Sequence, residues 1–310
     1  MSEQFEYYLR QAFLGNIPHL ELDKSEYDEI VKAKDILDSA LAIEEKYDLV
    51  LGNFVDFERE LLVLTMDGMF DISFDYGRAY NILSVLNRRA ANFVIMGKNY
   101  TELISSMASK SAKDKVEVAA KVKQLSHQIY DTSFEYRFAE ALRNHIAHSA
   151  DAVHSVGSPH NWLMGEDNQA ETLVFNLEVF SLKERLLLNA GFKRSVLNDC
   201  EDKIDLKITL RKYMGAISEI QDEVRALTKT SVDEARNLIQ GFTDRYEEIN
   251  KGDAFGLAAY SQSDSESGKK PLSISLEWDN VRIKLEEKNQ SISNMDKRCV
   301  SSAIVKGRKK

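Results

Sequence analysis

Apolar residues recur at helical spacing through the first half of the chain. Ile30, Ala33, Leu37 and Leu41 are three or four positions apart, which places them on one face of a helix. Similar stripes predict more helices downstream. The further helices are expected over residues 47–70, 76–107, 113–130 and 133–148.

Five helices with short connections and one apolar face each are typical of an up-and-down bundle. The chain has only three prolines, which favours long uninterrupted helices. Gly97 marks a kink or break in the third helix. Residues 1–22 are expected to be a lead-in, in which Pro18 interrupts an initial helical turn.

The second half of the chain has a mixed pattern of helices, strands and loops. Ser231 and Glu234 fit a capping box, which predicts that a helix begins there. Helices are expected at 183–189, 204–227 and 231–249, strands at 172–182, 255–260 and 272–278, and an exposed loop at 154–168.

These patterns predict a mainly α protein, an up-and-down helical bundle with a small appended α+β region. The bundle is assigned to residues 1–155 and a mixed helix and strand region to 156–260. Residues 261–310 are expected to hold a strand, a helix and a flexible tail, after the polar linker SQSDSESGKK.

Composition limits the classes of protein that fit. Of the 310 residues, 43% are hydrophobic and 29% charged, enough to build a core. The formal net charge of −9 argues against a surface that attracts nucleic acid everywhere. RNA, if bound, must meet a local basic patch.

No cofactor or metal is expected. Cys200 and Cys299 are far apart without metal-ligand spacing, and glycine-rich phosphate loops are absent. The first residues, MSEQFEYYLR, lack the features of a signal peptide, and no apolar run is long enough to cross a bilayer. A cytoplasmic protein without membrane contact is therefore expected.

The strongest chemical signal is the run Arg143-Asn144-His145-Ile146-Ala147-His148. Arg143 supplies a permanent cation, and His148 supplies a group that exchanges protons near neutral pH. On a regular helix, five steps of about 100° place these two residues roughly 140° apart. A second copy of the chain, a frayed helix end or a swing of the arginine side chain would bring them together.

This motif resembles the signature of the HEPN superfamily, an arginine, a polar residue, three variable residues and a histidine near the end of a bundle helix. Arg143, Asn144 and His148 match it position by position. The resemblance implies a homodimeric, metal-independent endoribonuclease with RNA as substrate. It also implies a toxin–antitoxin or phage-defence setting and a regulatory partner protein.

In this interpretation Arg143 binds the scissile phosphate, and His148 exchanges a proton with the ribose 2′-hydroxyl or the leaving oxygen. Asn144 orients His148 or binds the substrate. In some family members a tyrosine follows the motif histidine after one residue and is modified by a partner enzyme. Here Ser149 and Ala150 follow, which argues against that control.

A structural interpretation stands beside the catalytic one. His148 would then bond a carbonyl group, and Arg143 would pair with Glu140 one turn earlier. The alternative function is a non-catalytic dimerisation or nucleotide- or RNA-binding module that acts with a partner protein.

Other polar residues are weaker candidates. His145 faces the apolar side of its helix, which favours a core or dimer contact, and the loop residues His154 and His160 could approach the site. Asn87, Arg88 and Arg89 either add a basic contact or form a salt-bridged face. The basic tail at 306–310 is expected to be solvated.

Overall fold

The computed structural model describes residues 5–15, 17–71, 73, 75–148, 151–165, 167–263, 271–290 and 292–300, without the side chains of Phe5, His148 and Ser263. The protein is mainly helical with small sheets, as the sequence predicts. The helices are α1 (Lys24–Phe70), α2 (Tyr76–Lys110), α3 (Lys115–Thr132), α4 (Phe134–His148), α5 (Lys183–Leu187), α6 (Arg194–Asp199), α7 (Leu206–Ile249) and α8 (Asp279–Lys288), with a 3-10 turn η1 (Met295–Lys297). The strands are β1 (Phe5–Gln11), β2 (Leu20–Leu22), β3 (Ser155–Gly157), β4 (His160–Met164), β5 (Ala170–Phe175), β6 (Glu178–Leu182), β7 (Lys203–Asp205), β8 (Leu257–Ser263) and β9 (Leu272–Ser273).

The chain divides into two compact units, each assembled from separate stretches. The first unit comprises residues 1–49, 100–126 and 221–290, and the second comprises 50–99, 127–220 and 291–310. This grouping differs from the consecutive segments 1–155, 156–260 and 261–310 expected from sequence. Among the residues described, no helix is long and apolar enough to cross a bilayer.

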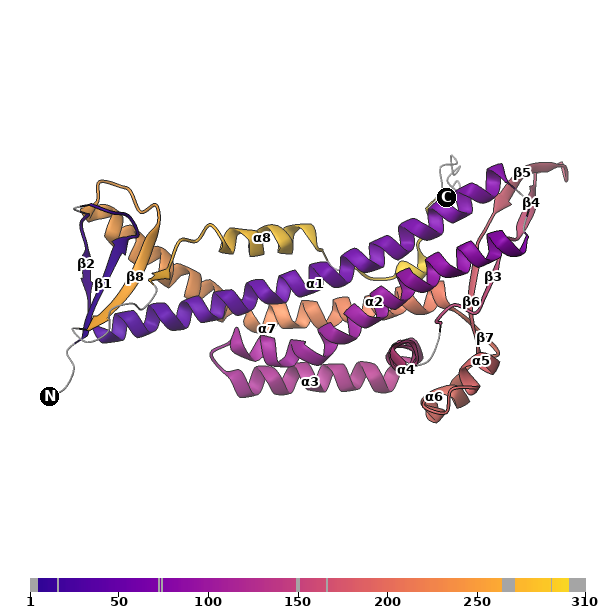
Figure 1. The fold of residues 1–310 in the computed structure, drawn as a ribbon, viewed down its shortest axis with the longest axis horizontal. Coiled ribbons are helices and arrows are strands. Elements are labelled where there is room, and N and C mark those ends of the chain that lie inside the picture. The colour runs from indigo at the N-terminus through magenta and orange to yellow at the C-terminus, as the bar shows by residue number, and fades with distance from the viewer. Residues whose placement is uncertain are drawn as a thin grey trace. The chain divides into compact units, whose positions relative to one another are not determined.

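An antiparallel sheet in the order β2-β1-β8-β9 belongs to the first unit, and β1, β2 and β8 lie side by side in Figure 1. Leu9 of β1 pairs with Ala259 of β8, and both are buried against apolar residues of α1 and α7, such as Leu37 and Ile239. The expected helical turn in residues 1–22 is therefore wrong. The alternating stretch FEYYLRQ becomes a strand because a partner strand about 250 residues later completes its hydrogen bonds.

The second unit has an aromatic core. Phe93 of α2 contacts Phe54 of α1 and Tyr213 of α7, with ring centroids 5.3 and 5.7 Å apart. Tyr136 of α4 lies 5.3 Å from Tyr213. These rings are buried and form the core of this unit.

The sequence divides two of the long helices in the wrong places. The expected helices around residues 30–41 and at 47–70 are one helix, α1, and those at 204–227 and 231–249 are one helix, α7. Neither junction contains glycine or proline, so nothing stops the helix. Ser231 is a buried residue inside α7, and its Oγ accepts a hydrogen bond of 3.0 Å from the backbone N–H of Lys113.

Gly97 does not break α2, which is continuous from Tyr76 to Lys110. A Cβ atom at this position would lie 2.7 Å from ring carbon Cε1 of Tyr213. The glycine therefore permits close packing of α2 against α7.

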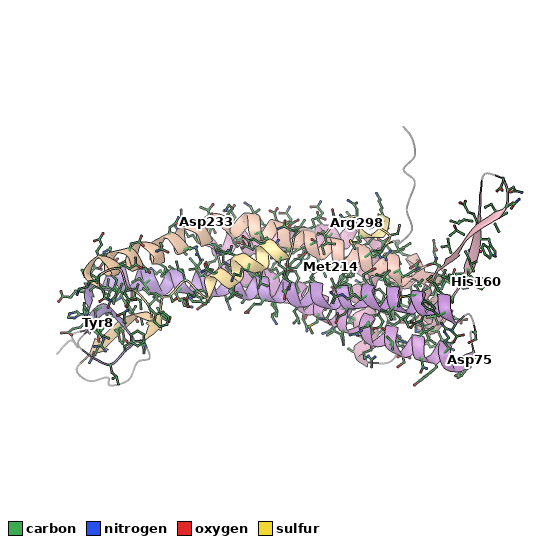
Figure 2. The ribbon with its side chains drawn as sticks, turned by 90° about the horizontal axis from the view of Figure 1, so that it is seen from above. Tyr8, Asp75, His160, Met214, Asp233 and Arg298 are labelled. Atoms are coloured by element: carbon green, nitrogen blue, oxygen red, sulfur yellow. The ribbon has the colours of Figure 1, made fainter. Side chains whose placement is uncertain are left out.

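Strands replace the loop expected at 154–168. β3 pairs with β6, and β4 pairs with β5 in a hairpin that carries His160 and projects from the helices in Figure 2. The single strand expected at 172–182 is interrupted at Asn176, whose N–H donates to the carbonyl of Pro159. The strand expected at 272–278 is limited to β9, because the chain turns there into α8.

Candidate functional site

The motif helix α4 is firmly anchored in the second unit. The Ser133 Oγ caps its start by accepting a 3.1 Å hydrogen bond from the N–H of Tyr136, and Glu135 lies in the first turn. Phe138 and Leu142 are fully buried, and Phe138 contacts Phe192 with ring centroids 6.1 Å apart. The buried face fixes which residues of α4 point toward solvent.

Arg143 and Asn144 lie on the accessible side of α4. The Nη1 of Arg143 donates a 3.1 Å hydrogen bond to Oδ1 of Asn144. Among the described residues, no carboxylate forms an ion pair with Arg143. Glu140 pairs instead with Lys98 and accepts a 3.2 Å hydrogen bond from the hydroxyl of Tyr213. The structural alternative for Arg143, a pair with Glu140, is therefore not realised.

His148 is the last residue of α4, and its side chain lies outside the described part of the structure, as do Ser149 and Ala150. The backbone remains helical through His148. Within one chain, Arg143 and His148 therefore leave the helix axis roughly 140° apart.

Asn144 borders a cavity of about 230 Å³ that contains basic groups. Lys98 and Lys193 line it with Tyr130, and the Nζ of Lys193 lies 4.8 Å from the centroid of the Tyr130 ring. Glu140 also lines the cavity and neutralises Lys98, so Lys193 is the cation that gives this side of α4 a local positive charge.

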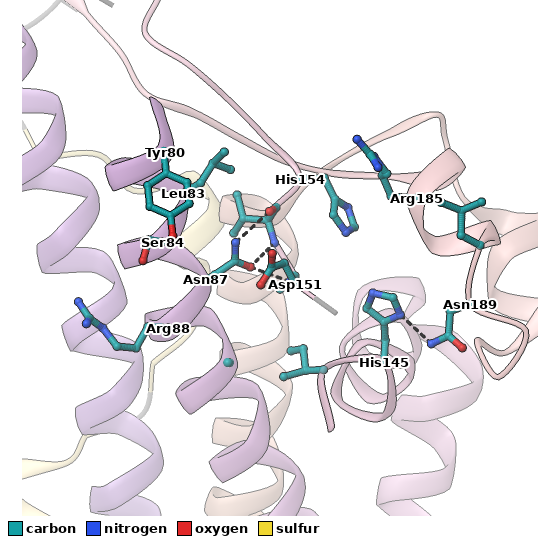
Figure 3. Close-up of a pocket in the computed structure, with 15 residues that line it drawn as sticks. Tyr80, Leu83, Ser84, Asn87, Arg88, His145, Asp151, His154, Arg185 and Asn189 are labelled. Atoms are coloured by element: carbon teal, nitrogen blue, oxygen red, sulfur yellow. Dashed lines mark hydrogen bonds between the residues drawn. The ribbon is translucent and has the colours of Figure 1, made fainter. Parts of the chain in front are cut away.

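A larger cavity of about 790 Å³ lies on the other side of α4 (Figure 3). Its polar lining comes from α2, α4, α5 and the segment that leads into β3. The described lining residues are Tyr80, Leu83, Ser84, Asn87, Arg88, Ala91, His145, Ile146, Asp151, Ala152, Val153, His154, Arg185, Leu188 and Asn189.

His145 is buried, as its place on the apolar face predicted, and only 2% of its surface is exposed. Its Nδ1 lies 2.8 Å from Nδ2 of Asn189, and Figure 3 shows its ring facing His154. Burial lowers the pKa of His145, and the nearby backbone and charge of Asp151 offset part of this effect. The neutral ring is therefore favoured near pH 7.

His154, which the sequence could bring near Arg143 and His148, lies at the larger cavity beside His145. Its ring centroid lies 6.2 Å from that of His145, and the planes are nearly perpendicular, at 79°. Burial lowers the pKa of His154, and the neighbouring His145 lowers it further. His160 is exposed on β4, where its ring contacts Phe175 and lies outside the cavity lining.

The neighbouring residues Asn87, Arg88 and Arg89 of α2 have different roles. Asn87 holds the segment before β3, because its Oδ1 accepts hydrogen bonds of 2.7 Å from the N–H groups of Ala152 and Val153. Arg89 forms ion pairs with Glu60 and Asp56, the salt-bridged arrangement considered from sequence. Arg88 is exposed at the cavity.

The cysteines are free. Cys200 is buried, which raises the pKa of its thiol to about 11, and Cys299 is exposed. The buried thiol of Cys200 is therefore a poor nucleophile at neutral pH. In the described part of the chain, no group of three or more histidine, cysteine or acidic residues could hold a metal ion.

The sequence pattern does not predict the grouping of His145, His154, Arg185 and Asn189. His145 and Asn189 are 44 positions apart, and no short motif links them. The nine-residue spacing of the histidines carries no recognised signature. Only the folded backbone brings these side chains to one cavity.

The fold and the site define a mainly helical protein whose capped motif helix borders two cavities, one lined by Lys98, Glu140 and Lys193 and the other by two histidines. Comparison with models of protein families, with curated proteins and with solved structures finds no match to this chain.

Proposed function

We propose that the protein is a HEPN-like, metal-independent endoribonuclease in which Arg143, Asn144 and His148 act on RNA. The observation that supports this best is the state of Arg143. Its guanidinium is partly exposed and bonded to Asn144, and it has no ion pair with a carboxylate among the described residues. Its charge is therefore available to a phosphate.

Arg143 binds the scissile phosphate through its remaining N–H donors and stabilises the charge that develops in the transition state. Asn144 holds one guanidinium nitrogen in place. Lys193, on the Asn144 side of α4, attracts the adjoining backbone of the RNA.

In the reaction, the ribose 2′-oxygen attacks phosphorus and the bond from phosphorus to the 5′-oxygen breaks. His148 takes the proton of the 2′-hydroxyl as general base. The leaving 5′-oxygen receives a proton from a general acid. The products are a 2′,3′-cyclic phosphate and a 5′-hydroxyl, and the net reaction consumes no other reactant.

A homodimer supplies the second catalytic group. One histidine cannot be base and acid in the same step, so His148 of the partner subunit serves as the acid. The angle of roughly 140° between Arg143 and His148 on one helix favours the same arrangement. The rate of RNA cleavage per protein molecule should then fall when the protein is diluted. The fall should occur over the concentration range in which sedimentation velocity shows the dimer dissociating.

The decisive experiment is cleavage of a mixed RNA pool by the purified protein in excess chelator. Arg143→Ala and His148→Ala should each lower the rate by about 100-fold or more, with unchanged circular dichroism. Arg59→Ala and His127→Ala remove an exposed arginine and an exposed histidine from other helices and should leave the rate unchanged. Full activity in His148→Ala would overturn the catalytic assignment.

The second candidate is a non-catalytic binding module that acts with a regulatory partner protein. The cavity beside His145 favours it, because its polar lining is fitted to bind rather than to react. RNA bound but not cleaved by the wild-type protein would support this candidate. A toxin or phage-defence role rests only on the resemblance of the motif.

A further inference from the structure

We infer that the cavity beside His145 binds the phosphate group of a small phosphorylated molecule. This site lies on the opposite side of α4 from Asn144 and goes beyond the proposed RNA cleavage. The cavity of about 790 Å³ is in the range of small-molecule sites.

The orientation of Asn189 fixes the hydrogen bonding of His145. The Oδ1 of Asn189 accepts a 2.8 Å hydrogen bond from the N–H of Gly191, so Nδ2 is the atom that faces His145. An amide nitrogen only donates, and Nδ1 of His145 must therefore accept. In the neutral ring the proton then resides on Nε2.

This Nε2–H group of His145 is buried and forms no hydrogen bond of good geometry with a described residue, although the backbone of Asp151 is close enough to raise the pKa of the ring. A buried donor without a partner costs free energy, and native proteins rarely leave one unsatisfied. Because the ring faces the cavity in Figure 3, an acceptor in the cavity would satisfy it.

His154, which is half-buried at the same cavity, carries its ring proton on the same nitrogen. Its Nδ1 accepts a 3.0 Å hydrogen bond from the N–H of Leu182 and lies 3.2 Å from Oγ of Ser181. Its neutral ring therefore also carries the proton on Nε2. Since both Nδ1 atoms are already occupied, neither ring offers a free basic nitrogen. The pair is suited to donate to an anion and not to remove a proton.

Positive charge at the cavity matches a phosphate. Arg88 of α2 and Arg185 of α5 line it, and neither forms an ion pair with a carboxylate among the described residues. Asp151 is the acidic residue of the described lining, so the arginines leave a net positive charge there. Arginine forks and imidazole N–H groups are strong donors to phosphate oxygens.

The lining also includes an apolar part for the rest of the ligand. Tyr80, Leu83 and Leu188 border the cavity, and the side chains of Tyr80 and Leu188 are exposed. A ring or chain attached to the phosphate would cover these residues.

Calorimetric titration with phenyl phosphate tests the inference. Phenyl phosphate should bind the wild-type protein more tightly than inorganic phosphate does, and phenol should not bind measurably. Arg185→Ala and Arg88→Ala should each weaken the affinity for phenyl phosphate about 10-fold, while Arg194→Ala, an exposed arginine of α6 outside the lining, should not change it.

A second measurement identifies the donors. In protein labelled with ¹⁵N-histidine, phenyl phosphate should shift the Nε2 resonances of His145 and His154 and leave that of His127 unchanged. Equal loss of affinity in Arg185→Ala and Arg194→Ala, or unchanged histidine resonances at saturation, would overturn the inference. RNA cleavage that persists in Arg185→Ala separates this site from the one proposed at Arg143 and His148.

Discussion

The close packing of α2 around Tyr213 depends on Gly97, which has no side chain. A Cβ at position 97 would lie 2.7 Å from Cε1 and 2.9 Å from Oη of this tyrosine, and 3.0 Å from Cδ1 of Ile217. Tyr213 and Ile217 are fully buried, so neither can move aside freely. Glycine at position 97 is a packing requirement although it weakens the helix.

Gly97→Ala should therefore destabilise the protein. Overpacking of about 1–3 kcal/mol outweighs the gain of up to about 1 kcal/mol in helix propensity. Gly52→Ala in α1 is the matched control, because a Cβ there meets nothing within 4 Å. It should stabilise the protein by up to about 1 kcal/mol. Urea unfolding of both variants measures the contrast, and a stabilised Gly97→Ala variant would contradict it.

The buried histidines predict a loss of stability in mild acid. Burial lowers the pKa values of His145 and His154 in the folded protein, so the unfolded chain binds protons more readily. Their contribution is complete above the unfolded pKa of about 6.5 and is lost as pH falls below it toward the folded values. The urea midpoint of the wild-type protein should therefore fall between pH 7.5 and 5.

The double variant His145→Gln, His154→Gln should show a smaller fall over the same pH range. His127→Gln controls for the loss of a histidine from the surface. If the urea midpoint of the double variant depends on pH as much as that of the wild-type protein, the loss of stability in acid does not come from His145 and His154.

At the scale of single residues, the sequence predicted part of the candidate site. Helical periodicity correctly placed His145 on the buried face of α4, and the end of that helix at His148 was also correct. Periodicity describes a single element, however. It could not show that Asn189, from a turn after α5, would fix the tautomer of His145.

At the scale of elements, a buried ionic cluster joins α1, α7 and α8 in the first unit. Glu44 of α1 is 2% exposed and accepts hydrogen bonds from Nε and Nη2 of Arg225 at 2.9 and 2.6 Å. Gln221 donates to it at 2.7 Å, and Nη1 of Arg225 donates to the carbonyl of Asn289 at the end of α8. Burial raises the pKa of Glu44, and Arg225 opposes this effect.

Glu44→Ala should lower the free energy of unfolding by about 3–5 kcal/mol, because it leaves the cation of Arg225 partly buried without its partner. Asp28→Ala is the control, since it breaks the exposed pair with Lys24 and should cost less than about 1 kcal/mol. Chemical denaturation measures both. Similar losses in the two variants would show that the Glu44 pair does not act as a buried one.

The helices were the best predicted elements and their ends the worst. The apolar stripes located α2, α3 and α4 to within a few residues. α1 and α7 were each divided. In α7, Ser231 and Glu234 imitate a capping box in the sequence, but Ser231 is buried inside the helix and bonds to Lys113. β1 was missed because its partner, β8, is distant in the sequence.

At the scale of the whole molecule, neither unit is contained in the first half of the chain. The sheet of the first unit needs β8, and the aromatic core of the second needs Tyr213. The segment 1–155, assigned from sequence to the bundle, lacks both.

A fragment of residues 1–155 should therefore fail to fold cooperatively. It exposes Leu9 and Phe93, which the missing parts cover in the full chain. Thermal unfolding by circular dichroism and limited proteolysis, each beside the full chain, test this. A sharp unfolding transition and a protease-resistant core in the fragment would contradict it.

The pairing of β1 with β8 also has a consequence for synthesis on the ribosome. Phe5 pairs with Ser263, so β1 is made roughly 250 residues before its partner strand β8. At about 5–20 residues per second, this delay is roughly 13–50 seconds. During that time the edge of FEYYLRQ that pairs with β8 is unpaired, and unpaired strand edges are the kind of surface that aggregates. β2 covers one edge of β1 soon after it is made, but the other edge stays open until β8 is made.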